Sequence, residues 1–138
     1  MDTDILIHSA RGIDEFVIYL AASLALLALF ISIYVWITPY REISLIREGN
    51  TAAAASLSGA VLGFAIPLAH AIAQSVTFLE MAMWGVIALA VQTLVFFVVR
   101  KLMPGIAKDI PAGKLAPGIL LGSLSLATGL LNSACMTY

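Results

Sequence analysis

Hydrophobic residues fill four long stretches of this chain that contain no Asp, Glu, Lys or Arg. These stretches run over residues 16–40, 49–79, 81–99 and 115–138. A helix needs about 20 mostly apolar residues to cross a hydrocarbon core about 30 Å thick, because each residue adds about 1.5 Å. Each stretch meets or nearly meets that length, so the pattern predicts an all-α membrane protein with four transmembrane helices. The predicted helices are at about 14–37, 51–75, 80–99 and 115–136.

Composition supports the same class of protein. Of the 138 residues, 62% are hydrophobic and 11% are charged, whereas a soluble domain has about 45–50% apolar and about 25% charged residues. Four spans use most of the chain and leave only tails and short connections. We therefore expect one membrane domain, 1–138, whose solvent is the lipid bilayer.

The four predicted helices are of two kinds. The first and third carry bulky apolar and aromatic residues, and we expect the third to be the most exposed to lipid. The second and fourth carry small residues at intervals of about four: Ala55, Gly59, Gly63, Gly118 and Gly122. Small residues at this spacing let two helix backbones approach closely in lipid. We expect these residues to form packing seams and, because seams also join subunits, we expect a homo-oligomer.

The order of features repeats along the chain. Pro39 follows an aromatic-rich helix and precedes a charged connection, Gly49 and a small-residue helix, and Pro104 and Gly113 introduce the same order about 64 residues later. The sequence thus predicts a tandem repeat of two helical hairpins, 14–75 and 80–138. With two crossings per unit, both copies have the same orientation, related by an axis along the membrane normal.

Basic residues predict the orientation of the chain. The connections at 39–50 and 100–114 hold six of the seven Lys and Arg residues, and only Arg11 lies on the other side. Lys and Arg concentrate in short cytoplasmic loops. We therefore expect both connections to be cytoplasmic and both termini to face outward.

Three passages give the chain a family resemblance. They are Ile37-Thr38-Pro39-Tyr40-Arg41-Glu42, the run from Gly49-Asn50-Thr51 through Ser58-Gly59 and Leu62-Gly63 to Ile66-Pro67-Leu68, and Leu131-Asn132-Ser133-Ala134-Cys135-Met136-Thr137. Together they resemble the YjfL-like bacterial inner-membrane proteins, whose domain is classed as of unknown function. The resemblance covers nearly the whole chain and implies a bacterial inner-membrane protein with four membrane helices. With the orientation expected from the basic residues, both termini are then periplasmic. It also implies an association with envelope-stress proteins and supplies no catalytic residues.

Polar residues gather toward the outer side of the predicted spans. His70, Gln74, Glu80 and Asn132 form a candidate outer-face site, in which His70 and Glu80 either make a proton-responsive pair or simply meet interfacial water. Pro67 predicts a kink, because it cannot donate to the carbonyl of Gly63. That carbonyl is then free for water or a ligand, or is satisfied by a neighbouring helix.

No motif in the chain predicts catalysis, a cofactor or a metal site, and a net charge of −1 gives no footprint for nucleic acid. We expect a non-enzymatic structural or scaffold protein linked to the bacterial envelope or its stress response, with a cytoplasmic protein partner bound through 39–50 and 100–114. The alternative is an oligomeric small channel or transporter with a polar outer mouth.

Overall fold

The described part of the chain, residues 2–136 in a computed structural model, is built from helices joined by short connections. The helices are α1 (Asp2–Ile37), α2 (Glu42–Arg47), α3 (Thr51–Gln74), α4 (Phe78–Leu102), α5 (Ile106–Asp109) and α6 (Leu115–Cys135). Four of these, α1, α3, α4 and α6, are long and apolar enough to cross a membrane. This confirms the predicted fold class of an all-α protein with four transmembrane helices.

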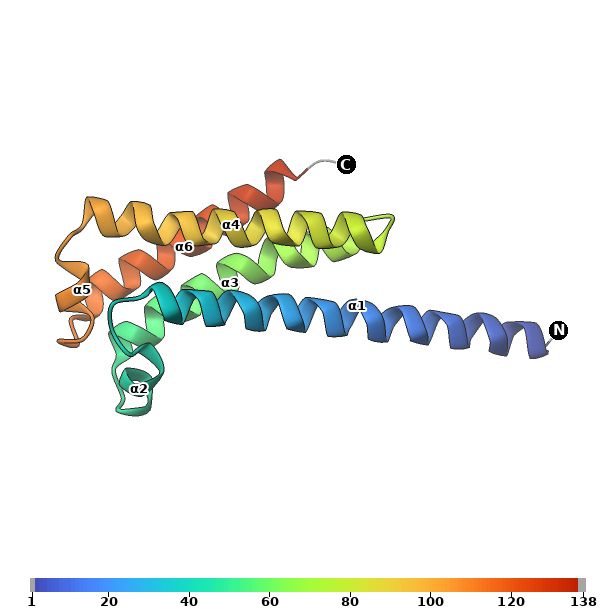
Figure 1. The fold of residues 1–138 in the computed structure, drawn as a ribbon, viewed down its shortest axis with the longest axis horizontal. Coiled ribbons are helices and arrows are strands. Elements are labelled where there is room, and N and C mark those ends of the chain that lie inside the picture. The colour runs from blue at the N-terminus through green and yellow to red at the C-terminus, as the bar shows by residue number, and fades with distance from the viewer. Residues whose placement is uncertain (1, 137–138) are drawn as a thin grey trace.

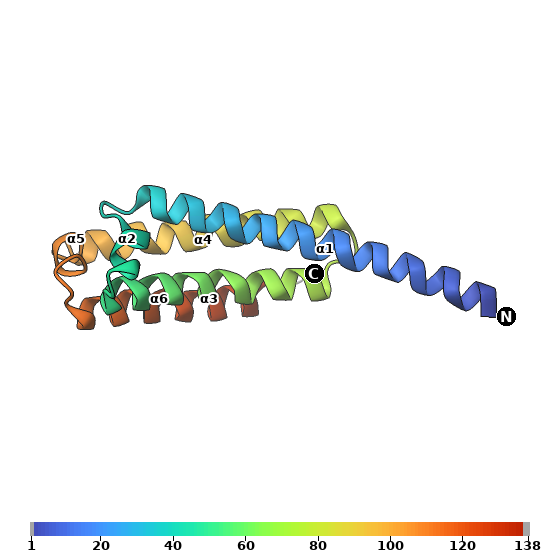
Figure 2. The ribbon, with the colours of Figure 1, turned by 90° about the horizontal axis from the view of Figure 1, so that it is seen from below.

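The long helices run side by side as a bundle in two layers. Helices α1 and α4 form one layer and α3 and α6 the other (Figure 2). The short helices α2 and α5 lie together at one end, and the α3–α4 turn lies at the opposite end, which we call the hairpin end (Figure 1). All of the polar connections therefore lie at the two ends of the bundle.

Helix α1 differs from its prediction in length and in exposure. It begins at Asp2 instead of about residue 14, because acidic Asp2 and Asp4 in the first turn suit the positive end of the helix dipole. With 36 residues it is about 54 Å long, and its N-terminal part projects beyond the bundle (Figure 2). It buries only Ser23, Phe30 and Tyr34, whereas α4 buries twice as many residues. The expectation that the helix at 80–99 is the most lipid-exposed is therefore wrong.

Helices α3 and α6 pack backbone against backbone. A Cβ added at Gly59 would overlap the backbone of Gly122, and one added at Gly118 would overlap the backbone of Ala52. Gly122 meets the backbone of Ala55 in the same way. The small residues of both helices thus form one seam inside a single chain. They give no separate argument for a homo-oligomer, which stays a prediction.

A buried amide at mid-bundle joins three helices around Pro67. Helix α3 continues through Pro67, whose missing N–H leaves the carbonyl of Gly63 without its usual helical donor. Gln92 Nε2 of α4 donates to that carbonyl at 2.9 Å and to the carbonyl of Ser125 in α6 at 3.2 Å. Of the two fates open to the Gly63 carbonyl, the structure therefore shows satisfaction by a neighbouring helix.

Exchange of Gln92 for leucine tests this role. We expect Gln92→Leu to lower the free energy of unfolding by about 1–2 kcal/mol, because a buried carbonyl loses its donor. The loss should shrink in a Pro67→Ala background, where the new N–H of residue 67 reaches Gly63. Thermal unfolding of the four variants in nanodiscs measures the coupling. Thr93→Val is the control, because Thr93 bonds only within α4, to Leu89; equal losses in both backgrounds would contradict the account.

The two short helices end in the same way. Gly49 and Gly113 have φ values of +86° and +79°. Each lies in the turn between a short helix and the membrane span that follows it, two residues after α2 and four residues after α5. The next N–H in each case returns to a carbonyl five residues back: Asn50 N to Leu45 O at 2.9 Å and Lys114 N to Asp109 O at 3.0 Å. This is the Schellman end that glycine favours. Recurrence of the motif agrees with a tandem repeat, which stays a prediction.

Candidate functional site

The end of the bundle that carries α2 and α5 is rich in positive charge. We call it the basic end and define it by its six basic residues: Arg41, Arg47, Arg100, Lys101, Lys108 and Lys114. All but the half-buried Arg100 are exposed. Three acidic residues lie among them, of which Asp109 pairs with Lys114 at 3.3 Å and Glu42 is buried. The exposed surface at this end is therefore strongly basic.

Asn50 joins the two connections that form the basic end. Its Oδ1 accepts the N–H of Ala53 at 3.0 Å and so caps α3, while its Nδ2 donates to the carbonyl of Ile110 at 2.8 Å. Ile106 and Ile110 are buried in the same core cluster as Tyr40. Segments far apart in the sequence are thus held in one fixed arrangement, which presents both sets of basic side chains together.

Two substitutions of Asn50 separate its two roles. We expect Asn50→Ala to lower the free energy of unfolding by about 1 kcal/mol because the cap of α3 is missing. The lost bond to Ile110 should lower it by a similar amount. Asn50→Asp keeps a capping oxygen and has no N–H to donate, so it should lose only the second part. Thermal unfolding in nanodiscs measures the free energy, and hydrogen exchange at residues 106–112 reports the loosened connection. Equal exchange in wild type and Asn50→Asp would contradict the joining role.

Beneath the basic end lies a buried carboxylate that the sequence analysis did not single out. Glu42, the first residue of α2, has no exposed surface, and Ser56 Oγ of α3 donates to its Oε1 at 3.1 Å. Burial raises the pKa of Glu42 from 4.5 to about 7, and the Ser56 bond lowers it in part. Burial likewise raises the pKa of Tyr40, followed in effect by the nearby Glu42 charge. The signal in the sequence was a glutamate directly after Thr-Pro-Tyr-Arg, which we treated as part of a charged connection.

The residues of the candidate outer-face site lie at the hairpin end with different partners. The His70 ring bonds the Met136 carbonyl at 3.1 Å, which ties α3 to the end of α6. Glu80 accepts the N–H of Val76 at 2.9 Å, and its own N–H donates to the Thr77 hydroxyl, so it stabilises the start of α4. These contacts give His70 and Glu80 structural roles.

The other two members of that site, Gln74 and Asn132, contribute less to the hydrogen bonding of the hairpin end. Gln74 is exposed at the end of α3. Asn132 is half-buried, and its Nδ2 finds no hydrogen-bond partner within the described residues. No group of three His, Cys, Asp or Glu side chains that could hold a metal ion occurs anywhere in residues 2–136. A functional role for the four outer-face residues stays a prediction.

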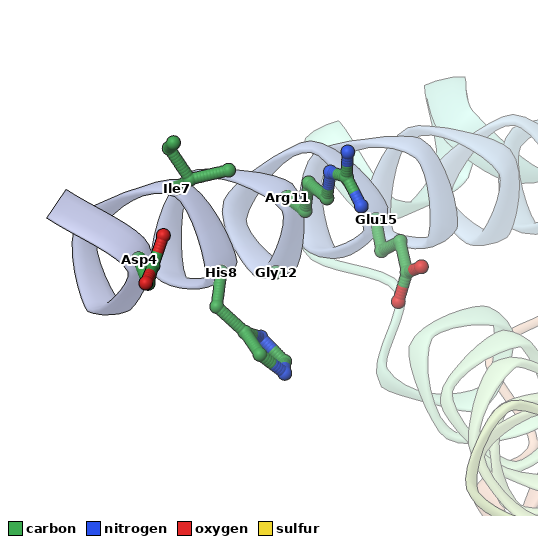
Figure 3. Close-up of a pocket in the computed structure, with 6 residues that line it drawn as sticks. All are labelled: Asp4, Ile7, His8, Arg11, Gly12 and Glu15. Carbon is green, nitrogen blue, oxygen red and sulfur yellow. The ribbon is translucent and has the colours of Figure 1, made fainter. Parts of the chain in front are cut away.

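A hollow of about 340 Å³ along the projecting part of α1 has charged residues around it. Its lining residues are Asp4, Ile7, His8, Arg11, Gly12 and Glu15 (Figure 3). All belong to one helix and all are exposed, and the side chains in Figure 3 point to several sides of that helix. A hollow without a second wall does not enclose a ligand, so we do not treat it as a binding site.

The four apolar spans, their buried polar contacts and the polar connections confined to the ends define a multi-pass integral membrane protein. Residues 6–136 match the family model described as Domain of Unknown Function (DUF350). The chain belongs to this family, and the resemblance drawn from the sequence is thereby confirmed.

Relatives with curated names cover most of the chain. It is 39% identical over 131 residues to the UPF0719 inner membrane protein YjfL of Escherichia coli (strain K12), covering 95% of this chain and 99% of the relative. It is 30% identical over 90 residues to the UPF0719 transmembrane protein YshE of Bacillus subtilis (strain 168), covering 65% of this chain and 67% of the relative. No solved structure matches the chain.

Proposed function

We propose that this protein is a non-enzymatic scaffold of the bacterial inner membrane, whose basic end faces the cytoplasm and binds an acidic surface of a cytoplasmic protein. The observation that carries the proposal is the Asn50 bond to Ile110, because it fixes two distant connections as one surface. A fixed surface loses little conformational entropy on binding. Positive charge on both connections also speeds the encounter with an acidic partner.

The orientation within this proposal rests on charge. Six basic residues lie at the basic end against Arg11 at the other, and short basic connections stay on the cytoplasmic side. The relative from Escherichia coli is named an inner membrane protein, which supports the same compartment here. With this orientation both termini are periplasmic, and the projecting part of α1 extends into the periplasm.

Charge reversal at the basic end tests the binding role. We expect the combined variant Arg41→Glu, Arg47→Glu, Lys101→Glu and Lys108→Glu to lose partner proteins that co-purify with the wild type from native membranes. The reason is that like charges then repel the acidic surface. Arg11→Glu is the matched control at the opposite end and should keep the partners. Unchanged partners in the reversed variant would contradict the proposal.

Two further measurements complete this test. Charge reversal can also invert the chain in the membrane, so labelling of the exposed Cys135 with a membrane-impermeant maleimide must give equal results in wild type and variant.

Purified protein in liposomes distinguishes the scaffold from the channel alternative. We expect no ion flux above empty vesicles, whereas flux that changes in His70→Ala or Glu80→Gln would favour a conduit between subunits.

A further inference from the structure

Glu42 lies in a cluster of buried oxygen atoms between α1, α2 and α3. Ser56 Oγ is 3.1 Å from Glu42 Oε1 and 3.0 Å from the carbonyl of Ala53. The serine hydroxyl has a single hydrogen, so it cannot donate to both oxygens at once. If Glu42 carries a proton, it donates to Ser56 Oγ and the serine donates to Ala53. Both short contacts are then hydrogen bonds.

The other oxygens of the cluster lack partners. Glu42 Oε2 and the hydroxyls of Tyr34 and Tyr40 are buried and make no hydrogen bond to any described residue. Both tyrosines lie close enough to Glu42 and to Ser56 to interact with them electrostatically. A buried carboxyl group that receives so few hydrogen bonds is poorly stabilised in its charged form.

No basic side chain neutralises Glu42. Within residues 2–136 the ion pair closer than 4 Å is that of Lys114 with Asp109. Arg41 precedes Glu42 and is exposed, and Arg100, at the end of α4, acts on Tyr40. An ionised carboxylate buried without a counter-charge is strongly unfavourable. Glu42 is therefore favoured in its neutral, protonated form.

We propose that Glu42, with the hydroxyls of Tyr34, Tyr40 and Ser56, forms a proton-binding site that exchanges its proton at the basic end. A hollow of about 470 Å³, lined by the end of α1 and by residues 38–44, lies beside the cluster and gives water a route to it. Burial holds the pKa of Glu42 at about 7, so the proton exchanges in the neutral range. The site is formed by this chain alone, so its existence does not depend on the proposed partner of the basic end.

Proton release has a structural consequence for α2. An ionised Glu42 is stabilised by moving toward water, and it is the first residue of α2. Loss of the proton therefore weakens the packing of α2 against α3, which Glu42 contacts through Ser56. Arg47 ends the same helix, so occupancy of the proton site alters the arrangement of the basic end.

Infrared difference spectra of the full chain in nanodiscs test the site. Between about pH 3 and about pH 9, a range that includes the ordinary pKa values of glutamate and histidine, the wild type should lose the carbonyl band of a buried, protonated carboxyl group with a midpoint near 7. Glu42→Gln should lack this band, and Glu48→Gln, which removes an exposed glutamate, should keep it. A band that persists in Glu42→Gln, or a midpoint near 4.5, would overturn the proposal.

Two further arms keep the test decisive. Ser56→Ala retains the carboxyl group and removes the hydroxyl that contacts Glu42 Oε1, so the midpoint should move away from its wild-type value; an unmoved midpoint contradicts the cluster. Replacement of choline chloride by sodium chloride at constant ionic strength should leave the midpoint unchanged. A midpoint that falls as sodium increases would assign the site to a metal cation in place of the proton.

Discussion

Replacement of Gly59 by alanine is expected to destabilise the protein by about 1–3 kcal/mol, although alanine is the better helix former by about 1 kcal/mol. The added methyl group would overlap the backbone of Gly122, which has no rotamer with which to move aside. The two helices then have to separate along the seam that contributes most of the packing between spans. Thermal unfolding in nanodiscs measures the loss.

Two companion variants sharpen this prediction. Gly12→Ala is the matched control, because a Cβ at Gly12 meets open space, and it should be neutral or stabilising. Gly59→Ala combined with Gly122→Ala should cost less than the sum of the single variants, since the first methyl group already separates the same backbones. Full additivity, or a neutral Gly59→Ala, would show that α3 and α6 are not in backbone contact.

The stability of the wild type is expected to fall as the pH rises through the neutral range because of Glu42. The folded protein holds the Glu42 proton up to about pH 7, whereas the unfolded chain releases it near 4.5. Between these values the folded state binds more protons, so the free energy of unfolding decreases with pH. The contribution is complete below 4.5 and lost above about 7. Its size is on the order of 3 kcal/mol, at about 1.4 kcal/mol for each pH unit.

Comparison with Glu42→Gln isolates this effect from other titrating groups. The variant is neutral at all pH values, so its stability relative to wild type should rise from about pH 4.5 to about pH 7 and level off above that, because only in this range does the folded wild type hold a proton that the unfolded chain has released. Glu48→Gln should follow the wild type, because Glu48 is exposed. Unfolding by denaturant in nanodiscs at several pH values measures the difference. A constant difference between wild type and Glu42→Gln would mean that Glu42 is ionised in the folded protein at all these values.

The sequence predicted the spans well because a bilayer imposes a simple requirement. Length and apolar content are local properties, so three of the long helices lie within a few residues of their predicted bounds. Helix α1 was misjudged at its start, because the criterion used was absence of charge. A helix outside the bilayer tolerates charge, and Asp2 and Asp4 favour its first turn.

Contacts between spans were less predictable. The spacing of Gly59 and Gly63 indicated close packing, but it carries no information on whether the partner helix belongs to the same chain. The partnership of Gln92 with Gly63 required the fold, because the two residues are far apart in the sequence. Pro67 was nevertheless a usable signal, since it indicated which carbonyl needed a donor.

The sequence placed the candidate site at the hairpin end, whereas the structure favours the basic end, and the difference has a physical reason. Polar residues near a span boundary, such as His70 and Glu80, resemble a functional site in the sequence. In the structure, however, both form hydrogen bonds with backbone groups at helix ends. Glu42 looked like an ordinary charge in a connection. Its burial depends on α2 folding back over α3 and on Ser56, which no local pattern reveals.

Site-specific photo-cross-linking in living cells is the most direct test of the central claim, that the basic end is where the protein binds its partner. A photoreactive amino acid in place of Ile43 or Lys108, both exposed at the basic end, should form a covalent adduct with a cytoplasmic protein. The adduct should disappear when Arg47 and Lys101 are reversed in charge. The same probe in place of Leu79, exposed at the hairpin end, should not form it. Adducts with cytoplasmic proteins from Leu79 and none from Ile43 or Lys108 would contradict the account.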